Sequence, residues 1–188
     1  MSTKRVVFSA LLFALAGMVL VMFVVGFTLL PDRFDVRTER SFAAPVQRVA
    51  ALLTDLKSWY DWASIDANLG PQTTREVAGV PGTAGQVMRW SGQKGTATLR
   101  FTAVGDSGLE YEFGGVLADG RDYPWRGQGR IEWQPDGERC RVVWRETLVW
   151  DTLAGRWVAW FGAQQERVQQ IQVSSLQGLD EVVAAAAK

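Results

Sequence analysis

The spacing of apolar residues changes twice along the chain, and each spacing predicts a different kind of element. Residues 6–30 carry no charged side chain. Between residues 34 and 150, several stretches alternate apolar and polar residues, which is the period of a half-buried strand. Residues 163–187 lack proline, and their apolar residues recur every three or four positions, as in an amphipathic helix. The pattern therefore predicts an apolar helix, a sheet and a long final helix.

The alternating stretches predict about seven strands. The turn sequence Pro135-Asp136-Gly137 separates the last two as a hairpin. In the stretch 96–104, alternation directs Leu99, Phe101 and Ala103 towards the core. A weak strand is expected within the glycine- and proline-rich stretch 68–85. The other strands are expected at residues 34–42, 86–91, 96–104, 109–115, 126–134 and 139–150.

Short helices are expected between the first two strands. Pro45 suits a first helical turn, and Val49, Leu52, Leu53 and Leu56 follow at helical spacing. Residues 59–62 are expected to form a second short helix or turn, and residues 157–162 an aromatic loop before the final helix.

The final helix carries an apolar stripe of Val168, Ile171, Leu179 and Val182. Two small residues, Ser175 and Gly178, interrupt this stripe where a packed helix usually carries larger side chains. We therefore expect a sheet that curves over this helix and leaves space for a ligand beside the two small residues.

Composition excludes several kinds of site. The chain of 188 residues has no histidine, so it lacks a Ser-His-Asp triad and the commonest metal ligand. Its single cysteine, Cys140, cannot form an internal disulfide or a cysteine-based metal cage. We expect no metal and no cofactor. The 20 basic residues are balanced by 20 acidic ones and form no basic patch in the sequence, which argues against nucleic-acid binding.

Residues 6–30 are expected to form a membrane anchor, followed by a domain from residue 31 to residue 188. As a helix, the apolar segment spans about 37 Å, enough to cross a hydrocarbon core of about 30 Å. A signal peptide is the alternative, but its apolar core is shorter and ends at a small-residue cleavage site, which Phe27-Thr28-Leu29-Leu30-Pro31 lacks.

The orientation of the anchor is suggested by its flanking charges. Lys4 and Arg5 favour a cytoplasmic N-terminus and place the domain outside the cytoplasm, in the periplasm. Arg33, Arg37 and Arg40 oppose this orientation, although long domains are translocated largely regardless of charge.

The order of strand, two helices, six strands and a long helix resembles the helix-grip superfamily. This superfamily, often called SRPBCC, includes START lipid-transfer domains, birch-pollen-allergen-like proteins and polyketide cyclases. The resemblance implies an α+β fold in which a curved antiparallel sheet wraps around the C-terminal helix. It covers nearly all of the soluble part and is carried by Arg40-Ser41-Phe42-Ala43-Ala44-Pro45, Gly127-Gln128-Gly129-Arg130-Ile131, Pro135-Asp136-Gly137, Arg141-Val142-Val143-Trp144 and Leu176-Gln177-Gly178-Leu179.

Alternation places two charged residues, Arg40 and Glu146, on otherwise apolar faces of the first and last strands. In the helix-grip fold these strands are antiparallel neighbours, so the two side chains are expected to meet on the concave face. The hypothesis is that the pair orients the polar end of an apolar ligand. A purely structural ion pair is the alternative.

Aromatic residues are expected to line the cavity, although ordinary core packing is nearly as consistent with the pattern. The complete set of expected ligand-binding residues is Arg40, Met88, Trp90, Phe101, Tyr111, Phe113, Trp133, Trp144, Glu146, Ser175 and Gly178.

Three functions remain open on the sequence alone. The first is a membrane-anchored domain that binds a hydrophobic small molecule, such as a lipid, quinone or polyketide-like compound. The second is a cyclase- or dehydratase-like enzyme that uses the same cavity. Its acid or base candidates are Glu146, Asp61, Asp66 and Tyr111, but none lies in a catalytic motif, so no catalytic residue is assigned. The third is a non-catalytic interaction protein of the envelope with a closed cavity.

Two tryptophans and a phenylalanine precede the final helix. Because tryptophan favours the lipid–water interface, Trp157, Trp160 and Phe161 are expected either to touch the bilayer or to fold over the core.

Overall fold

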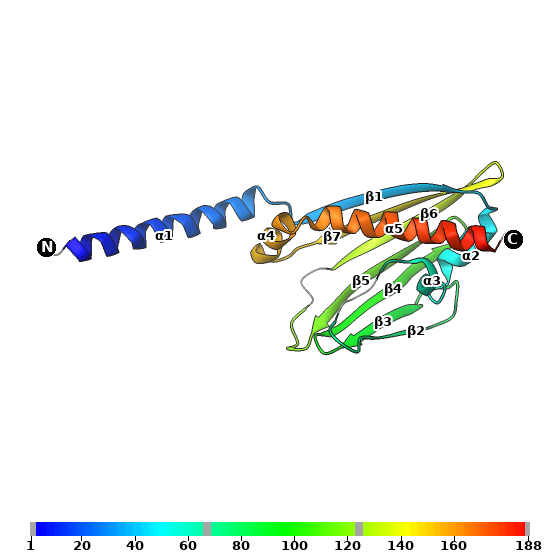
Figure 1. Cartoon of the computed structure of the whole chain (residues 1–188), viewed down its shortest axis with the longest axis horizontal. Helices are drawn as coiled ribbons and strands as arrows, with labels where there is room; N and C mark the ends of the chain where they lie inside the picture. The colour runs from blue at the N-terminus through cyan, green and yellow to red at the C-terminus, as the bar shows by residue number, and fades with distance from the viewer. Residues whose placement is uncertain (1–2, 66–68, 123–125, 187–188) are drawn as a thin grey trace.

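The computed structural model describes residues 3–65, 69–122 and 126–186. The first helix, α1 (Thr3–Thr28), projects from one end of the remaining chain (Figure 1). Its segment Leu11–Thr28 has a mean hydropathy of 2.6 and is 6% buried, so it is long and apolar enough to cross a membrane. A signal sequence has the same properties.

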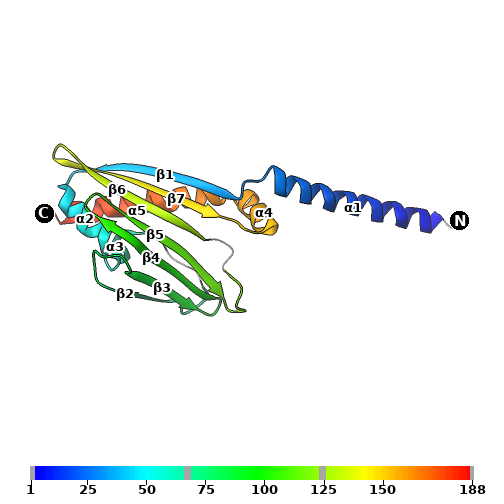
Figure 2. The same cartoon turned by 180° about the vertical axis from the view of Figure 1, so that it is seen from behind.

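The rest of the chain is built on one antiparallel sheet with the strand order β1-β7-β6-β5-β4-β3-β2. The predicted number of strands is confirmed. Figure 2 shows the sheet from behind, with β1 at one edge and β2 at the other. The strands are β1 (Arg33–Phe42), β2 (Thr74–Ala78), β3 (Val87–Gly92), β4 (Gly95–Gly105), β5 (Gly108–Leu117), β6 (Arg126–Asp136) and β7 (Arg139–Val149).

Alternation determines which side chains face inwards, with one exception in β4. Ala97, Leu99 and Phe101 are buried as expected, but Ala103 is exposed. The register against β5 shifts between Phe101 and Ala103, so Thr102 is an extra residue in a β-bulge. The bulge reverses the alternation, and Val104 takes the inward position that was predicted for Ala103.

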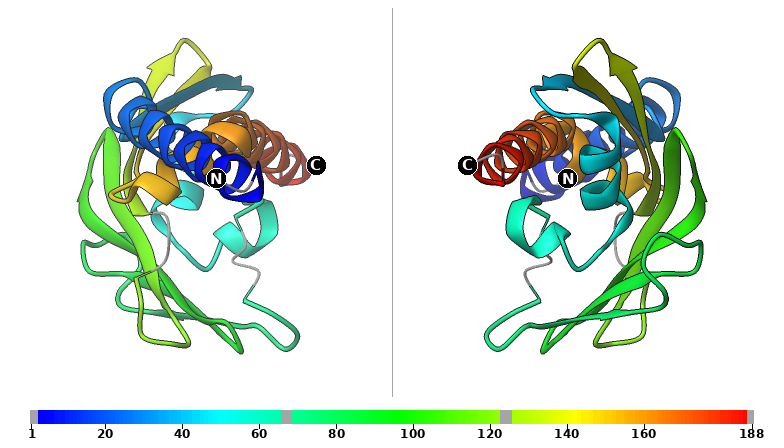
Figure 3. Two further views of the ribbon diagram at one scale, coloured as in Figure 1. Left: turned by 90° about the vertical axis from the view of Figure 1, so that its left-hand side faces the viewer. Right: turned by 90° about the vertical axis from the view of Figure 1, so that its right-hand side faces the viewer.

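The described residues after α1 contain the helices α2 to α5. The short helices α2 (Val46–Thr54) and α3 (Trp59–Trp62) occupy the predicted positions between β1 and β2. The last helix, α5 (Gln164–Ala185), runs along the concave side of the sheet. Viewed end on, the sheet curves around α5, α2 and α3 (Figure 3). The predicted helix-grip arrangement is therefore confirmed.

The prediction of an aromatic loop at residues 157–162 is wrong, since most of this segment belongs to a helix. Helix α4 (Leu153–Phe161) begins after Thr152, whose side-chain oxygen accepts a hydrogen bond from the Gly155 amide at 3.0 Å. The chain then turns at Gly162 and at Ala163, which has a left-handed backbone (φ 47°), and enters α5.

The buried stripe of α5 is displaced from the predicted one. Of the expected residues only Leu179 is fully buried, whereas Val168, Ile171 and Val182 are half-buried. The displacement arises because α5 contacts β1 on one side and α3 on the other, so its most covered line lies between these contacts. That line consists of Gln172, Ser175, Leu176, Leu179 and Val183.

Candidate functional site

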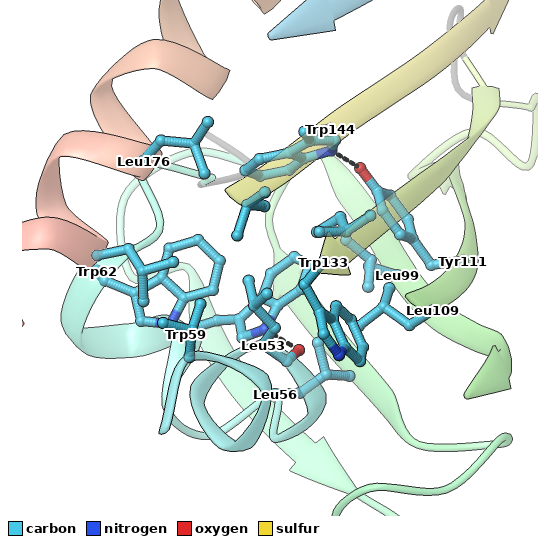
Figure 4. Close-up of a cluster of buried hydrophobic side chains, with 14 of the residues drawn as sticks. Leu53, Leu56, Trp59, Trp62, Leu99, Leu109, Tyr111, Trp133, Trp144 and Leu176 are labelled. Carbon is cyan, nitrogen blue, oxygen red and sulfur yellow. Dashed lines mark hydrogen bonds between the residues drawn. The ribbon is translucent and has the colours of Figure 1, made fainter. Parts of the chain in front are cut away.

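One half of the concave face is a packed aromatic core rather than a cavity. Trp59 lies at its centre, with its ring centroid 5.7 Å from that of Phe101 and 6.0 Å from those of Tyr111 and Trp144. Trp62 adds a further contact at 5.0 Å. Figure 4 shows the rings of Trp59, Trp62, Tyr111 and Trp144 together with Leu53 of α2 and with Leu99 and Leu109 of the sheet. Among the predicted lining residues, those buried on this inner face are Met88, Trp90, Phe101, Tyr111, Trp133 and Trp144.

A buried polar group borders this core. Tyr111 on β5, Gly129 on β6 and Glu146 on β7 are cross-strand neighbours. The Tyr111 hydroxyl donates a short hydrogen bond to Oε1 of Glu146 and accepts one from Nε1 of Trp144 at 2.7 Å, drawn in Figure 4. From α5, Nε2 of Gln172 donates to Oε2 of Glu146 at 2.9 Å. We call Tyr111, Trp144, Glu146 and Gln172 the Glu146 cluster.

The missing side chain of Gly129 makes the Glu146 cluster possible. The Tyr111 ring has to cross β6 to reach Glu146, and a Cβ atom at Gly129 would lie well under 3.0 Å from this ring. A similar crossing occurs one row further along, where a Cβ atom at Gly127 would lie 2.5 Å from Cζ of Phe113. Gly127 and Gly129 thus admit aromatic rings from β5.

Burial controls the protonation of the cluster. Desolvation raises the pKa of the Glu146 carboxyl above its ordinary value, although the hydrogen bonds from Tyr111 and Gln172 oppose this shift. Desolvation also raises the pKa of Tyr111 well above 10.0, and the charge of Glu146 adds to the effect. Tyr111 therefore stays neutral and remains a hydrogen-bond donor.

The cluster has one unused acceptor. Gln172 is fully buried, yet its Oε1 atom has no hydrogen-bond partner among the described residues. Gln172 is not among the predicted site residues, because a glutamine between apolar residues of a helix usually faces solvent. The available signal was its position seven residues before Leu179 and four after Val168, which places it on the same side of the helix.

The predicted pair of Arg40 and Glu146 does not form. In the register of β1 against β7, Arg40 lies opposite Val142 and Glu146 opposite Val36, an offset of four residues or about 13 Å along the strand. Arg40 instead forms an ion pair with Asp180 of α5 at 2.7 Å, with both side chains more than a third exposed. Arg40 thus joins β1 to α5 at the surface.

The expected space beside Ser175 and Gly178 is filled by the chain around α3. The Ser175 hydroxyl accepts a hydrogen bond from the Ser64 amide at 2.8 Å and donates one to the Ile171 carbonyl at 2.7 Å. A Cβ atom at Gly178 would lie 2.5 Å from the carbonyl oxygen of Trp62. The two small residues therefore admit a close backbone contact rather than a ligand.

Beyond the Glu146 cluster, the concave face is less covered. The next cross-strand row is Phe113, Gly127, Leu148 and Phe34, in which only Leu148 is fully buried. On the facing helix, Val168 and Ile171 are also half-buried. We call Phe34, Phe113, Gly127, Val168 and Ile171 the half-open end.

The half-open end lies on the side of the domain from which α1 projects. Strand β1 begins with Arg33, shortly after α1 ends, and β7 leads from Leu148 into α4. Figure 1 shows α4 at this end, next to α1.

Other features of the described residues do not form a competing site. Residues 3–65, 69–122 and 126–186 contain no group of three or more acidic or cysteine side chains that could hold a metal ion. A depression of about 260 Å³ lies on the outer face of the sheet, beside exposed Glu110, Gln128 and Arg130. Of the other acid candidates, Asp61 is exposed on α3 and Asp66 lies outside the described residues.

Solved structures with the same fold come from several bacteria. The aromatase/cyclase Zhui from Streptomyces sp. R1128 has a TM-score of 0.59 and 16% identity, over 83% of this chain and 96% of that one. TTHA0849 from Thermus thermophilus has a TM-score of 0.56 and 24% identity, over 82% and 100% of the two chains. DynU16, from the dynemicin biosynthetic locus, has a TM-score of 0.56 and 15% identity, but this chain covers only 48% of it. At these identities the likeness establishes the fold alone.

The family assignment rests on a sequence comparison. A search of the curated proteins gives no match. The family model described as polyketide cyclase / dehydrase and lipid transport matches residues 33–184, the whole of the sheet and nearly all of α5. This match agrees with the helix-grip resemblance of the sequence. The chain therefore belongs to the polyketide cyclase / dehydrase and lipid transport family.

Proposed function

We propose that the protein is a membrane-anchored domain that binds a hydrophobic small molecule or lipid at the half-open end of its concave face. The family description names both lipid transport and polyketide chemistry, and ligands of both kinds are largely apolar. Phe34, Phe113, Val168 and Ile171 supply an apolar surface, and the packed core behind the Glu146 cluster limits how far a ligand extends.

The observation that carries this proposal is the Oε1 atom of Gln172, which has no hydrogen-bond partner in the part of the chain that the structure describes. Leaving a buried acceptor unpaired costs about 1–3 kcal/mol, because the atom has lost its hydrogen bonds to water. A ligand hydroxyl group would offset this cost by donating to Oε1. The favoured ligand is therefore an apolar molecule with a hydroxyl group at its inner end.

The anchor is the second part of the proposal. Residues 1–30 form the anchor and residues 31–188 the binding domain. Helix α1 has the length and hydropathy of a membrane span and no cleavage motif at its end. Lys4 and Arg5 favour a cytoplasmic N-terminus, so the domain lies on the periplasmic side.

Solvent extraction of the purified full-length protein, followed by mass spectrometry, tests the binding function. Val168 lies one helical turn before Gln172, and Val168→Trp places a large side chain at the half-open end. Val173→Trp is the matched control, since Val173 is exposed on α5. We expect a hydrophobic molecule in extracts of the parent and of Val173→Trp, and little or none from Val168→Trp. Equal amounts from all three proteins would refute the proposed binding position.

A cyclase- or dehydratase-like activity is the second candidate, favoured by the raised pKa of Glu146. A carboxyl group that retains its proton closer to neutral pH is a suitable general acid, and the cluster lies beside the proposed binding surface. Once the extracted molecule is identified, turnover of its polyketide-like precursor by the parent and by Glu146→Gln tests this function. An enzyme requires turnover that the substitution abolishes, whereas binding without turnover supports the first proposal.

A further inference from the structure

Helix α4 carries an exposed apolar surface that the binding function does not use. Val158 is 58% exposed, Trp160 is 56% exposed and Phe161 is 76% exposed. In a helix of nine residues with Arg156 as its sole charged residue, this surface is unfavourable in water. A segment with this composition needs an apolar environment.

The position of α4 next to α1 indicates which environment covers it. A Cβ atom at Gly26 of α1 would lie 2.7 Å from Nε1 of Trp157, so the missing side chain lets the two helices touch. Nη1 of Arg156 lies 3.5 Å from the carbonyl oxygen of Phe27, and its guanidinium group lies over the Phe27 ring. This cation sits at the C-terminal end of α1, where the helix dipole is negative and α1 itself supplies no basic residue.

We infer that α4 lies in the lipid–water interface, with Val158, Trp160 and Phe161 in contact with lipid. This inference rests on the proposed anchor: if α1 crosses the bilayer, Gly26 and Phe27 lie near its boundary, and α4 is held at the same level. Leu29, directly after α1 in the chain, is also apolar and 72% exposed. Tryptophan is favoured at this depth, and amphipathic helices bind there by burying their apolar face.

The consequence for the domain is a fixed orientation on the membrane. Because α4 and the half-open end lie at the same end of the domain, contact of α4 with lipid turns the half-open end towards the bilayer. A hydrophobic ligand then passes between the bilayer and the concave face with little exposure to water.

Spin labels on two valines test this inference in the full-length protein reconstituted into liposomes. Val158→Cys places a nitroxide on α4, and Val80→Cys is the matched control. Val80 is 66% exposed in the β2–β3 connection, where the Gly82 amide donates to the Thr54 carbonyl of α2. Figure 1 shows α2 at the end of the domain opposite α1. The parent protein, whose only thiol is the buried Cys140, gives the background labelling.

The measurement compares how often the nitroxide collides with oxygen, which concentrates in lipid, and with a water-soluble nickel complex. We expect collisions with oxygen to be more frequent at position 158, and collisions with the nickel complex to be more frequent at position 80. More frequent collisions with the nickel complex at both positions would overturn the inference. A label at position 158 that neither reagent reaches would also overturn it, because protein would then cover α4. An alkaline carbonate wash tests the anchor separately: release of the protein overturns both proposals, whereas retention with a nickel-accessible residue 158 overturns only the contact of α4.

Discussion

The Glu146 cluster can form only because residue 129 is a glycine and has no Cβ atom. Tyr111 reaches Glu146 across β6 because Gly129 has no side chain. Alternation in the sequence correctly placed Tyr111 and Glu146 on the inner face. It did not reveal that they interact, because contact across an intervening strand depends on the register of β5 against β6 and of β6 against β7.

Gly129→Ala should lower the free energy of unfolding by about 1–3 kcal/mol, as expected for overpacking. The new methyl group forces the Tyr111 ring away from Glu146. Gly114→Ala in β5 is the control, because its Cβ atom would make an ordinary contact of 3.5 Å with Arg126. Urea denaturation of the full-length protein measures both changes. If the two variants are equally stable, the claim that the Tyr111 ring leaves no room for a side chain at residue 129 is wrong.

Glu146 should give the protein a characteristic dependence of stability on pH. Because burial raises the pKa of this carboxyl in the folded state above its ordinary value of 4.5, the folded chain binds the proton more tightly than the unfolded chain. The contribution of Glu146 to stability therefore falls as pH rises from 4.5 through the raised pKa.

Glu146→Gln removes this titration, and the new amide can donate to Oε1 of Gln172 once the Gln172 amide turns so that Oε1 replaces Nε2. We expect the stability of the variant relative to the parent to increase as pH rises through this window. Denaturation of both proteins at a series of pH values measures the difference, in which the effects of other carboxylates cancel. A stability difference that does not change with pH would show that folding does not raise the pKa of the Glu146 carboxyl.

Arg40 illustrates what a strand pattern can and cannot predict. Its face was predicted correctly, since alternation depends only on neighbouring residues. Its partner was not, because a pair across two strands also depends on their register. Strand β1 ends at Phe42 and β7 begins at Arg139, so no turn between them sets this register.

At the scale of elements, α5 shows how neighbouring elements modify a sequence pattern. A 3.6-residue period correctly predicted the helix, but the buried line also depends on where β1 and α3 contact it. Helix α4 was missed because its aromatic residues were interpreted by type rather than by spacing. The capping residue Thr152 was the available signal for its start.

Gly178→Ala should destabilise the protein by about 1–3 kcal/mol, although alanine favours a helix by up to about 1 kcal/mol over glycine. The added methyl group meets the Trp62 carbonyl and separates α3 from α5. Ser174→Ala, at an exposed position of the same helix, should be neutral or slightly stabilising. Thermal unfolding of the two variants provides the comparison. Stabilisation by Gly178→Ala would contradict the close contact of the two helices.

At the scale of the whole molecule, the order of elements was enough to predict the helix-grip architecture. The cavity predicted beside Ser175 and Gly178 was not correct, because the backbone of Trp62 and Ser64 fills that space. Trp59 and Trp62 also pack one half of the concave face. What remains is an uneven concave face: a packed aromatic core at the end away from α1, the Glu146 cluster at its border, and the half-open end next to α1 and α4.

The most direct test of this account is native mass spectrometry of the full-length protein released from nanodiscs. The account predicts a complex with one apolar molecule per chain for the parent and for Val173→Trp, and the bare chain for Val168→Trp. If the parent also appears only as the bare chain, or if Val168→Trp retains the molecule, the concave face is not the binding site.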